Sequence, residues 1–109
     1  MSEKKLYDFY TDRLNELDKK LVDKAIKAVN KFIPKKDKKM IIEAVRKNKY
    51  NWSSPYHFQW GMWCRNQFRE HVCSDNKLPT GNWDDYYVPL VELALGIRKE
   101  GKINDIRKS

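Results

Sequence analysis

The sequence predicts an all-α fold, a compact single-domain bundle of four to five helices around a central aromatic-rich helix. Apolar residues recur at steps of three and four along most of the chain, as on one face of a helix. No alternating strand pattern persists, and only four Gly and four Pro interrupt the 109 residues. A chain of this length suits one domain. We expect the domain to span residues 1–96, with residues 97–109 forming a polar, basic tail that is partly ordered at best.

The first expected helical segment extends from residue 3 to residue 32. A single long helix fits its pattern, and so do two helices with a break near Asp18. Because the residue before a proline avoids the α-helical region, Pro34 ends the segment. The apolar positions that share one helical face are Tyr10, Leu14, Leu17, Leu21, Ala25, Ala28 and Phe32.

A run of charged residues, Lys35–Lys39, follows Pro34 and is expected to be a connector outside the core. Within it, Asp37 has a side chain suited to capping the N-terminus of a helix. We therefore expect a short helix through residues 40–45, which fades over residues 47–51.

The aromatic-rich helix has the clearest predicted start. Ser54 is a good N-cap, and Pro55 then occupies the first helical position, where its missing N–H costs nothing. We expect this helix to be central, because its apolar residues cover much of its circumference. Gly61 lies inside the apolar arc and indicates close approach of another backbone. The arc comprises Tyr56, Trp60, Gly61, Trp63, Cys64, Phe68 and Val72, with His57 and His71 within it.

The last expected helix follows a loop over residues 74–82. Asp84 and Asp85 favour a helix N-terminus by capping and by their interaction with the helix dipole. The strongly apolar run over residues 86–95 follows, and Gly96 is a natural residue just beyond the helix end.

The aromatic-rich segment resembles a family of small, uncharacterised bacterial domains with the signature His-Phe-Gly-x-Gly-x-Trp-x-Arg-Asn. The resemblance covers roughly residues 55–95, and Gln59 replaces the first glycine of the signature. It implies a shared fold and carries no activity that can be transferred. The residues that match are His57, Phe58, Gly61, Trp63, Arg65 and Asn66, followed by the Asp84-Asp85 helix start.

Polar residues of this motif can serve structure or chemistry. One hypothesis makes Arg65 and Asn66, with Asp84 and Asp85, an anion-binding or catalytic cluster. The other, which we favour, is a buried or half-buried ion pair that ties two helices together, since the planar guanidinium can hold a carboxylate through two hydrogen bonds. His57 would then be a hydrogen-bonded core histidine.

Most of the cysteines and histidines are too widely spaced for a shared site, and only His71 with Cys73, at the end of the helix, could share a metal. On one helix, Cys64 and Cys73 would lie ~13 Å apart along the axis, whereas a disulfide needs Cα atoms within ~7 Å. His57 and His71 are each seven residues from Cys64, about two helical turns, which is too far for thiol activation or for a common zinc ion. We therefore expect free thiols, no metal, no cofactor and no catalytic residue.

Positive charge is concentrated in the first half of the chain. Residues 1–50 hold 15 Lys and Arg against 8 Asp and Glu, whereas residues 51–109 hold 8 against 7. After residue 23, the lysines form a stripe of the kind that attracts phosphate backbones, opposed only by Asp37. A plain solubilising surface is the alternative interpretation. The stripe comprises Lys24, Lys27, Lys31, Lys35, Lys36, Lys38 and Lys39.

These observations predict a small, basic, non-enzymatic binding or accessory module in the cytoplasm. The first candidate partner is DNA or RNA, bound without sequence specificity because no base-reading motif accompanies the lysines. A protein partner that contacts exposed aromatics such as Trp52, Tyr56 or Tyr86 is one alternative. An enzyme with a polar pocket of His57, Arg65 and Asp84 or Asp85 is another. No apolar run or secretory signal indicates a membrane partner or export.

Overall fold

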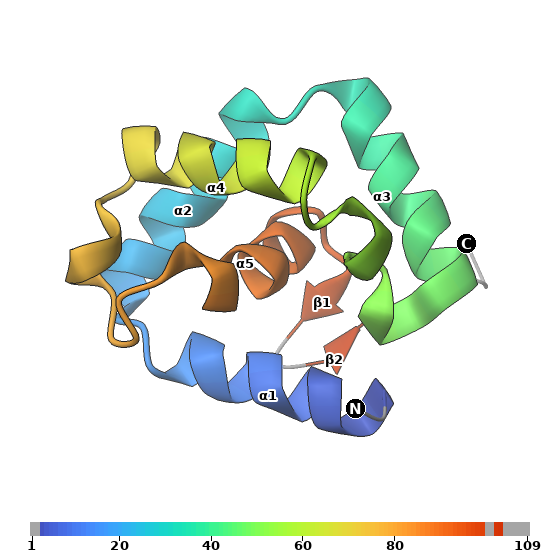
Figure 1. Ribbon diagram of the computed structural model, residues 1–109, viewed down its shortest axis with the longest axis horizontal. Helices are drawn as coiled ribbons and strands as arrows, with labels where there is room; N and C mark the ends of the chain where they lie inside the picture. The colour runs from blue at the N-terminus through green and yellow to red at the C-terminus, as the bar shows by residue number, and fades with distance from the viewer. Residues whose placement is uncertain (1–2, 100–101, 104–109) are drawn as a thin grey trace.

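The computed structural model describes residues 3–99 and 102–103, and over this part of the chain the protein is an all-α domain (Figure 1). This confirms the predicted fold class. Single turns of 3-10 helix, η1 to η4, connect the later helices: Lys49–Asn51, Ser54–Tyr56, Asp75–Lys77 and Trp83–Asp85. The described α-helices are α1 (Glu3–Asn15), α2 (Lys19–Phe32), α3 (Lys35–Asn48), α4 (Trp60–His71) and α5 (Tyr87–Ala94).

The centre of the bundle is α5 rather than the aromatic-rich helix. Every residue from Tyr87 to Glu92 is buried, and Figure 1 shows α5 in the middle of the other four helices. The aromatic-rich helix, α4, packs against α2 and α5 as one of the surrounding elements. An apolar run of this length cannot present a polar face to water, so its burial on all sides follows from its composition.

The first segment is two helices, which confirms one of the two predicted arrangements. Asp18 has an extended backbone, and its Oδ1 accepts a hydrogen bond of 2.8 Å from the Leu21 amide. This side-chain cap satisfies one of the free amides at the start of α2. The break therefore lies at Glu16–Asp18, between α1 and α2.

The expectation of a charged connector over Lys35–Lys39 is wrong, because α3 begins at Lys35. Pro34 has an extended backbone and its carbonyl accepts hydrogen bonds from the Asp37 and Lys38 amides, 3.0 and 3.1 Å long. Asp37 thus lies in the first turn of α3 rather than before it. Lysine is a good helix former, so a lysine run directly after the proline continues as helix.

The long helix expected from Tyr56 is interrupted. Residues 54–56 form one 3-10 turn, the chain turns again over residues 57–59, and α4 begins at Trp60. Tertiary contacts hold both sides of this interruption. Trp52 is fully buried and donates to Glu92 Oε2 at 2.8 Å, while the Trp60 indole donates to Asp37 Oδ2 at 3.1 Å. These tertiary hydrogen bonds hold the chain in an interrupted conformation, although the local sequence favours a continuous helix.

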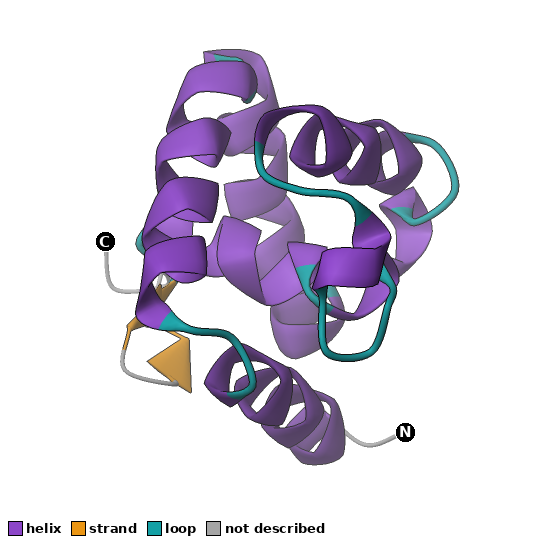
Figure 2. Ribbon diagram, turned by 90° about the vertical axis from the view of Figure 1, so that its left-hand side faces the viewer, coloured by secondary structure: helices purple, strands orange, loops and turns teal. Residues whose placement is uncertain are grey.

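The end of α5 has the expected glycine, but the domain continues beyond it. Gly96 has a φ of +74°, and the Ile97 amide donates to the Glu92 carbonyl at 2.9 Å, which closes the helix end. Ile97 and Arg98 are buried, so the expected boundary at residue 96 does not mark the edge of the core. Arg98–Lys99 (β1) pairs antiparallel with Lys102–Ile103 (β2), as Figure 2 shows. The rest of the expected tail, residues 100–101 and 104–109, lies outside the described residues.

Within residues 3–99 and 102–103, no helix combines the length and the apolar character that crossing a membrane requires.

Candidate functional site

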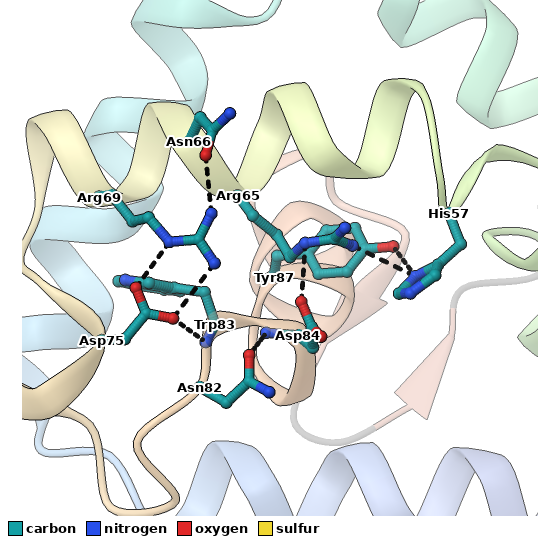
Figure 3. A network of polar contacts seen from close by, with 9 residues as sticks. All are labelled: His57, Arg65, Asn66, Arg69, Asp75, Asn82, Trp83, Asp84 and Tyr87. Carbon is teal, nitrogen blue, oxygen red and sulfur yellow. Dashed lines mark hydrogen bonds and ion pairs between the residues drawn. The ribbon is translucent and has the colours of Figure 1, made fainter.

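Polar side chains of the motif meet where the start of α5 faces α4 (Figure 3). Arg65 Nε lies 2.7 Å from Asp84 Oδ1, which is the predicted pair between the two helical segments. The Arg65 side chain is 7% exposed and the Asp84 side chain 41% exposed. The guanidinium also lies over the Tyr87 ring, 5.1 Å from its centroid. This half-buried ion pair therefore ties α4 to the turn that precedes α5.

His57 completes this cluster because the chain turns back before α4. Its Nδ1 lies 3.2 Å from Arg65 NH1 and 3.1 Å from the Tyr87 hydroxyl. A guanidinium has donors only, so in a hydrogen bond between these two groups Nδ1 is the acceptor. His57 forms polar contacts as expected, but it is half-buried rather than in the core. Burial raises the pKa of the Tyr87 hydroxyl, which therefore stays protonated at neutral pH.

Gly61 allows the close approach that the sequence indicated. A Cβ built on this residue would lie 2.7 Å from the Tyr87 hydroxyl and 3.2 Å from both Arg65 NH1 and the Tyr56 carbonyl. A hydroxyl, a guanidinium and a backbone carbonyl thus occupy the space that a side chain would need. The glycine is required by this packing, and its side-chain-free surface is not open to a ligand.

The remaining motif residues lie outside the cluster. Trp63 packs its ring edge-on against Phe32, with centroids 5.7 Å apart. Asn66 is exposed and accepts a 2.7 Å hydrogen bond from Arg69, which also binds Asp75 through two nitrogens at 2.6 and 3.2 Å. Asp85 forms no ion pair with any described residue.

The geometry of the cluster favours structure over chemistry. The Arg65 guanidinium is buried and paired with Asp84, whereas His57 and Asp84 are half-buried. Of the aromatics expected to be exposed for a protein partner, Trp52 and Tyr86 are fully buried and Tyr56 is half-buried. Trp52 and Tyr86 also use their polar atoms internally, on Glu92 and Glu16.

Both thiols are free, as expected. Burial raises the pKa of the Cys64 thiol far above its usual range, and it also raises the pKa of Cys73. Neither thiol is a reactive thiolate at neutral pH. Among the described residues, no three His, Cys, Asp or Glu side chains come together in a way that could hold a metal ion.

A second buried network of polar side chains was not predicted from the sequence. Glu92, on α5, accepts hydrogen bonds from Trp52 at 2.8 Å and from Arg98 at 3.0 Å, and both charged side chains are essentially inaccessible to water. Arg98 also donates to Thr11 Oγ1 at 2.7 Å and lies over the Tyr7 ring. Burial raises the pKa of Glu92, while Arg98 and the Trp52 N–H favour its charged form. One sequence signal was available, since a glutamate inside an apolar helix requires a partner.

The predicted lysine stripe is divided between two helices. Lys24, Lys27 and Lys31 share one face of α2, at spacings of three and four. Lys35, Lys36, Lys38 and Lys39 lie in the first turns of α3, after the bend at Pro34. Within the described part of the chain, none of the seven forms an ion pair, and six are exposed, with Lys38 half-buried.

A hollow opens between the lysine face of α2 and the C-terminal end of α4. We call it the α2–α4 hollow; its volume is about 450 Å³. All lining residues belong to the described part of the chain, and none of them is acidic. His71 enters from α4, a contribution that the sequence did not indicate. The lining comprises Lys24, Lys27, Ala28, Lys31, Phe32 and His71.

Comparison with models of protein families, with curated proteins and with solved structures finds no match to this chain. The candidate site therefore rests on its own geometry.

Proposed function

We propose that this domain binds polyanions, and nucleic acid without sequence preference, through the lysines of α2 and of the start of α3. One observation carries the proposal: seven lysines lie close together in the sequence, and none has an anionic partner among the described residues. Clustered like charges repel one another, and a phosphate backbone relieves that repulsion while releasing condensed counterions.

The position of the four lysines at the start of α3 also supports the proposal. Lys35, Lys36, Lys38 and Lys39 lie at the N-terminal end of α3, where the helix dipole disfavours positive charge. Each lysine within the first turn costs about 0.3–1 kcal/mol at a typical exposed site. A bound anion would interact favourably with both the lysines and the helix end. A surface that served solubility alone would gain nothing from this arrangement.

Sequence-independent binding follows from the kind of residues involved. Lysine contacts phosphates as a point charge, whereas base readout needs side chains held against base edges in a groove. The domain contributes a charged surface, so contacts between its lysines and the phosphate backbone of the nucleic acid should dominate the affinity.

Fluorescence anisotropy of a labelled DNA duplex, titrated with the protein at ~50 mM salt, tests the proposal at the low-salt end where such contacts are strongest. We expect a complex whose log affinity falls with log salt concentration at a slope of about −0.9 per phosphate contact. Changing all four lysines at the start of α3 to glutamate should abolish binding. It should leave α3 folded, because acidic residues suit a helix N-terminus.

A control with the same charge change uses exposed lysines elsewhere on the domain. Reversing Lys5, Lys47, Lys49 and Lys77 to glutamate should weaken binding less than the α3 variant does. Equal losses from the two variants would mean that net charge, rather than this surface, governs the interaction. The absence of a complex at high micromolar protein would overturn the proposal, and the lysines would then serve solubility.

A further inference from the structure

The α2–α4 hollow combines positive charge with a fixed aromatic ring. The imidazole of His71 lies nearly parallel to the Phe32 ring, with an interplanar angle of 17° and centroids 6.2 Å apart. Phe32 is itself held edge-on by Trp63 and Phe68, at 5.7 and 5.4 Å. His71 is exposed, so its ring rests on a rigid support and still meets solvent.

The charges of the hollow are arranged along one edge. Lys24, Lys27 and Lys31 follow one another on α2 at helical spacing. Lys24 Nζ donates to the Val72 carbonyl at 3.0 Å, which fixes this ammonium at the end of α4. An ammonium has three donors, so two stay available to a ligand. The row therefore presents one anchored cation and two free side chains.

The combination of a lysine row with a stacked aromatic pair goes beyond what binding a phosphate by charge alone requires. A phosphate requires only the lysines, and the aromatic pair adds a flat apolar surface beside them. Binding of single-stranded nucleic acid uses the same two elements, a cationic row for the backbone and aromatic rings on which bases stack. The volume of about 450 Å³ lies within the range of pockets that enclose a small ligand.

We propose that the α2–α4 hollow holds one nucleotide unit of a single-stranded nucleic acid, with its phosphate on the α2 lysines and its base on the His71 ring. This inference rests on the proposed polyanion binding and names the ligand class of one part of that surface. A duplex keeps its bases paired and stacked, so it can engage the lysines but not the ring. The hollow therefore favours single strands over duplexes and over anions that lack a base.

The test compares two polyanions, a thymidine oligonucleotide and inorganic polyphosphate of matched charge, by titration calorimetry with the full chain. His71→Ala removes the ring, and His71→Tyr restores an aromatic ring at the same place. We expect His71→Ala to weaken oligonucleotide binding about tenfold, near the lower end of what one stacked base contributes. Polyphosphate binding should change less than twofold, and His71→Tyr should recover most of the oligonucleotide affinity.

Charge in the hollow is tested separately. Lys27→Gln combined with Lys31→Gln should weaken both ligands, whereas the control pair Lys47→Gln and Lys77→Gln should have a smaller effect on each. Circular dichroism checks that every variant is folded, and His71→Tyr distinguishes a lost ring from a disturbed helix end.

The outcomes separate the two proposals. If His71→Ala leaves oligonucleotide binding unchanged, or weakens both ligands equally, the nucleotide subsite is wrong and polyanion binding stands. The same conclusion follows if the unaltered protein prefers polyphosphate to the oligonucleotide. If it binds neither ligand at high micromolar concentration, polyanion binding fails and the subsite fails with it.

Discussion

The interior and the lysine surface of this domain carry positive charge in opposite ways. Arg65 and Arg98 are enclosed, and each contacts a carboxylate within 3.0 Å. The lysines of α2 and of the start of α3 are mostly exposed and lack such partners among the described residues. A charge removed from water must be paired or its burial is too costly, whereas a hydrated ammonium stays available to a ligand. Paired arginines thus hold the fold together, and the unpaired lysines supply the proposed binding surface.

The two enclosed pairs differ in how far water reaches them. Both side chains of the Arg98–Glu92 pair are inaccessible, at 0% and 1% exposure, whereas Asp84 in the other pair is 41% exposed. If one partner is lost, a carboxylate such as Asp84 can be solvated again, but Arg98 cannot. The cost of breaking each pair should follow this difference.

The largest effect is expected from Glu92→Ala. It leaves the Arg98 charge and the Trp52 N–H buried without their partner, which should cost about 3–5 kcal/mol of unfolding free energy. Urea unfolding followed by circular dichroism measures this loss. The double variant Glu92→Leu with Arg98→Met should recover much of it, since an apolar pair of similar size carries no buried charge. A loss below about 1 kcal/mol for Glu92→Ala would show that this pair is not enclosed.

Arg65→Ala should have an intermediate effect. It removes a charged hydrogen bond to Asp84 and the contact with the Tyr87 ring, so we expect a loss of about 1.5–3 kcal/mol. Solvation of the exposed part of Asp84 keeps the loss below that of Glu92→Ala. The same urea titration compares the two variants directly. A shift within ~0.5 kcal/mol, typical of surface substitutions, would contradict the structural role of Arg65.

Gly61→Ala tests the packing around the Arg65 cluster. Helix propensity alone would make alanine more stable than glycine here by about 1 kcal/mol. The added Cβ would instead lie 2.7 Å from the Tyr87 hydroxyl and 3.2 Å from a backbone carbonyl. We expect a net destabilisation of about 1–3 kcal/mol, as for other overpacked sites. A thermal midpoint above that of the unaltered protein would mean that the cluster is loosely packed.

The smallest effect is expected from Asp75→Asn, which removes a partly exposed pair with Arg69, at 29% and 36% side-chain exposure. The hydrogen bond from Arg69 holds the pKa of the Asp75 carboxyl below its usual range. The carboxylate therefore stabilises the fold above the unfolded-state pKa, and this contribution is lost as the pH falls through the folded-state value. We expect at most about 1 kcal/mol at neutral pH, shrinking in acid. Urea titrations of both proteins at neutral and acidic pH measure the difference, and a constant difference would contradict this assignment.

The sequence predicted the fold class from local helical pattern, and it predicted a pair between Arg65 and Asp84 or Asp85 from the chemistry of these side chains. Helical periodicity, the cap at Asp18 and the glycine at the end of α5 act within a few residues of one another. The interruption before α4 could not be predicted in this way, since Trp52 and Trp60 are anchored by residues 40 and 23 positions away. Burial of Arg98 depends on the same kind of long-range contact, with Thr11. His71 joins the α2–α4 hollow only through the packing of α4 on α2.

The central claim is that the lysines of α2 and α3 bind anions and contribute little to holding the fold together. The most direct measurement is the thermal midpoint, with and without inorganic polyphosphate, of the unaltered protein and of the variant with glutamate at positions 35, 36, 38 and 39. A ligand that binds only the folded state stabilises it by RT ln(1 + L/Kd), where L is the free ligand concentration, so the midpoint rises with ligand concentration. We predict that polyphosphate raises the midpoint of the unaltered protein only, and that without ligand the variant is at least as stable. A variant that is markedly less stable without ligand, or an unaltered protein whose midpoint does not rise, would contradict the claim.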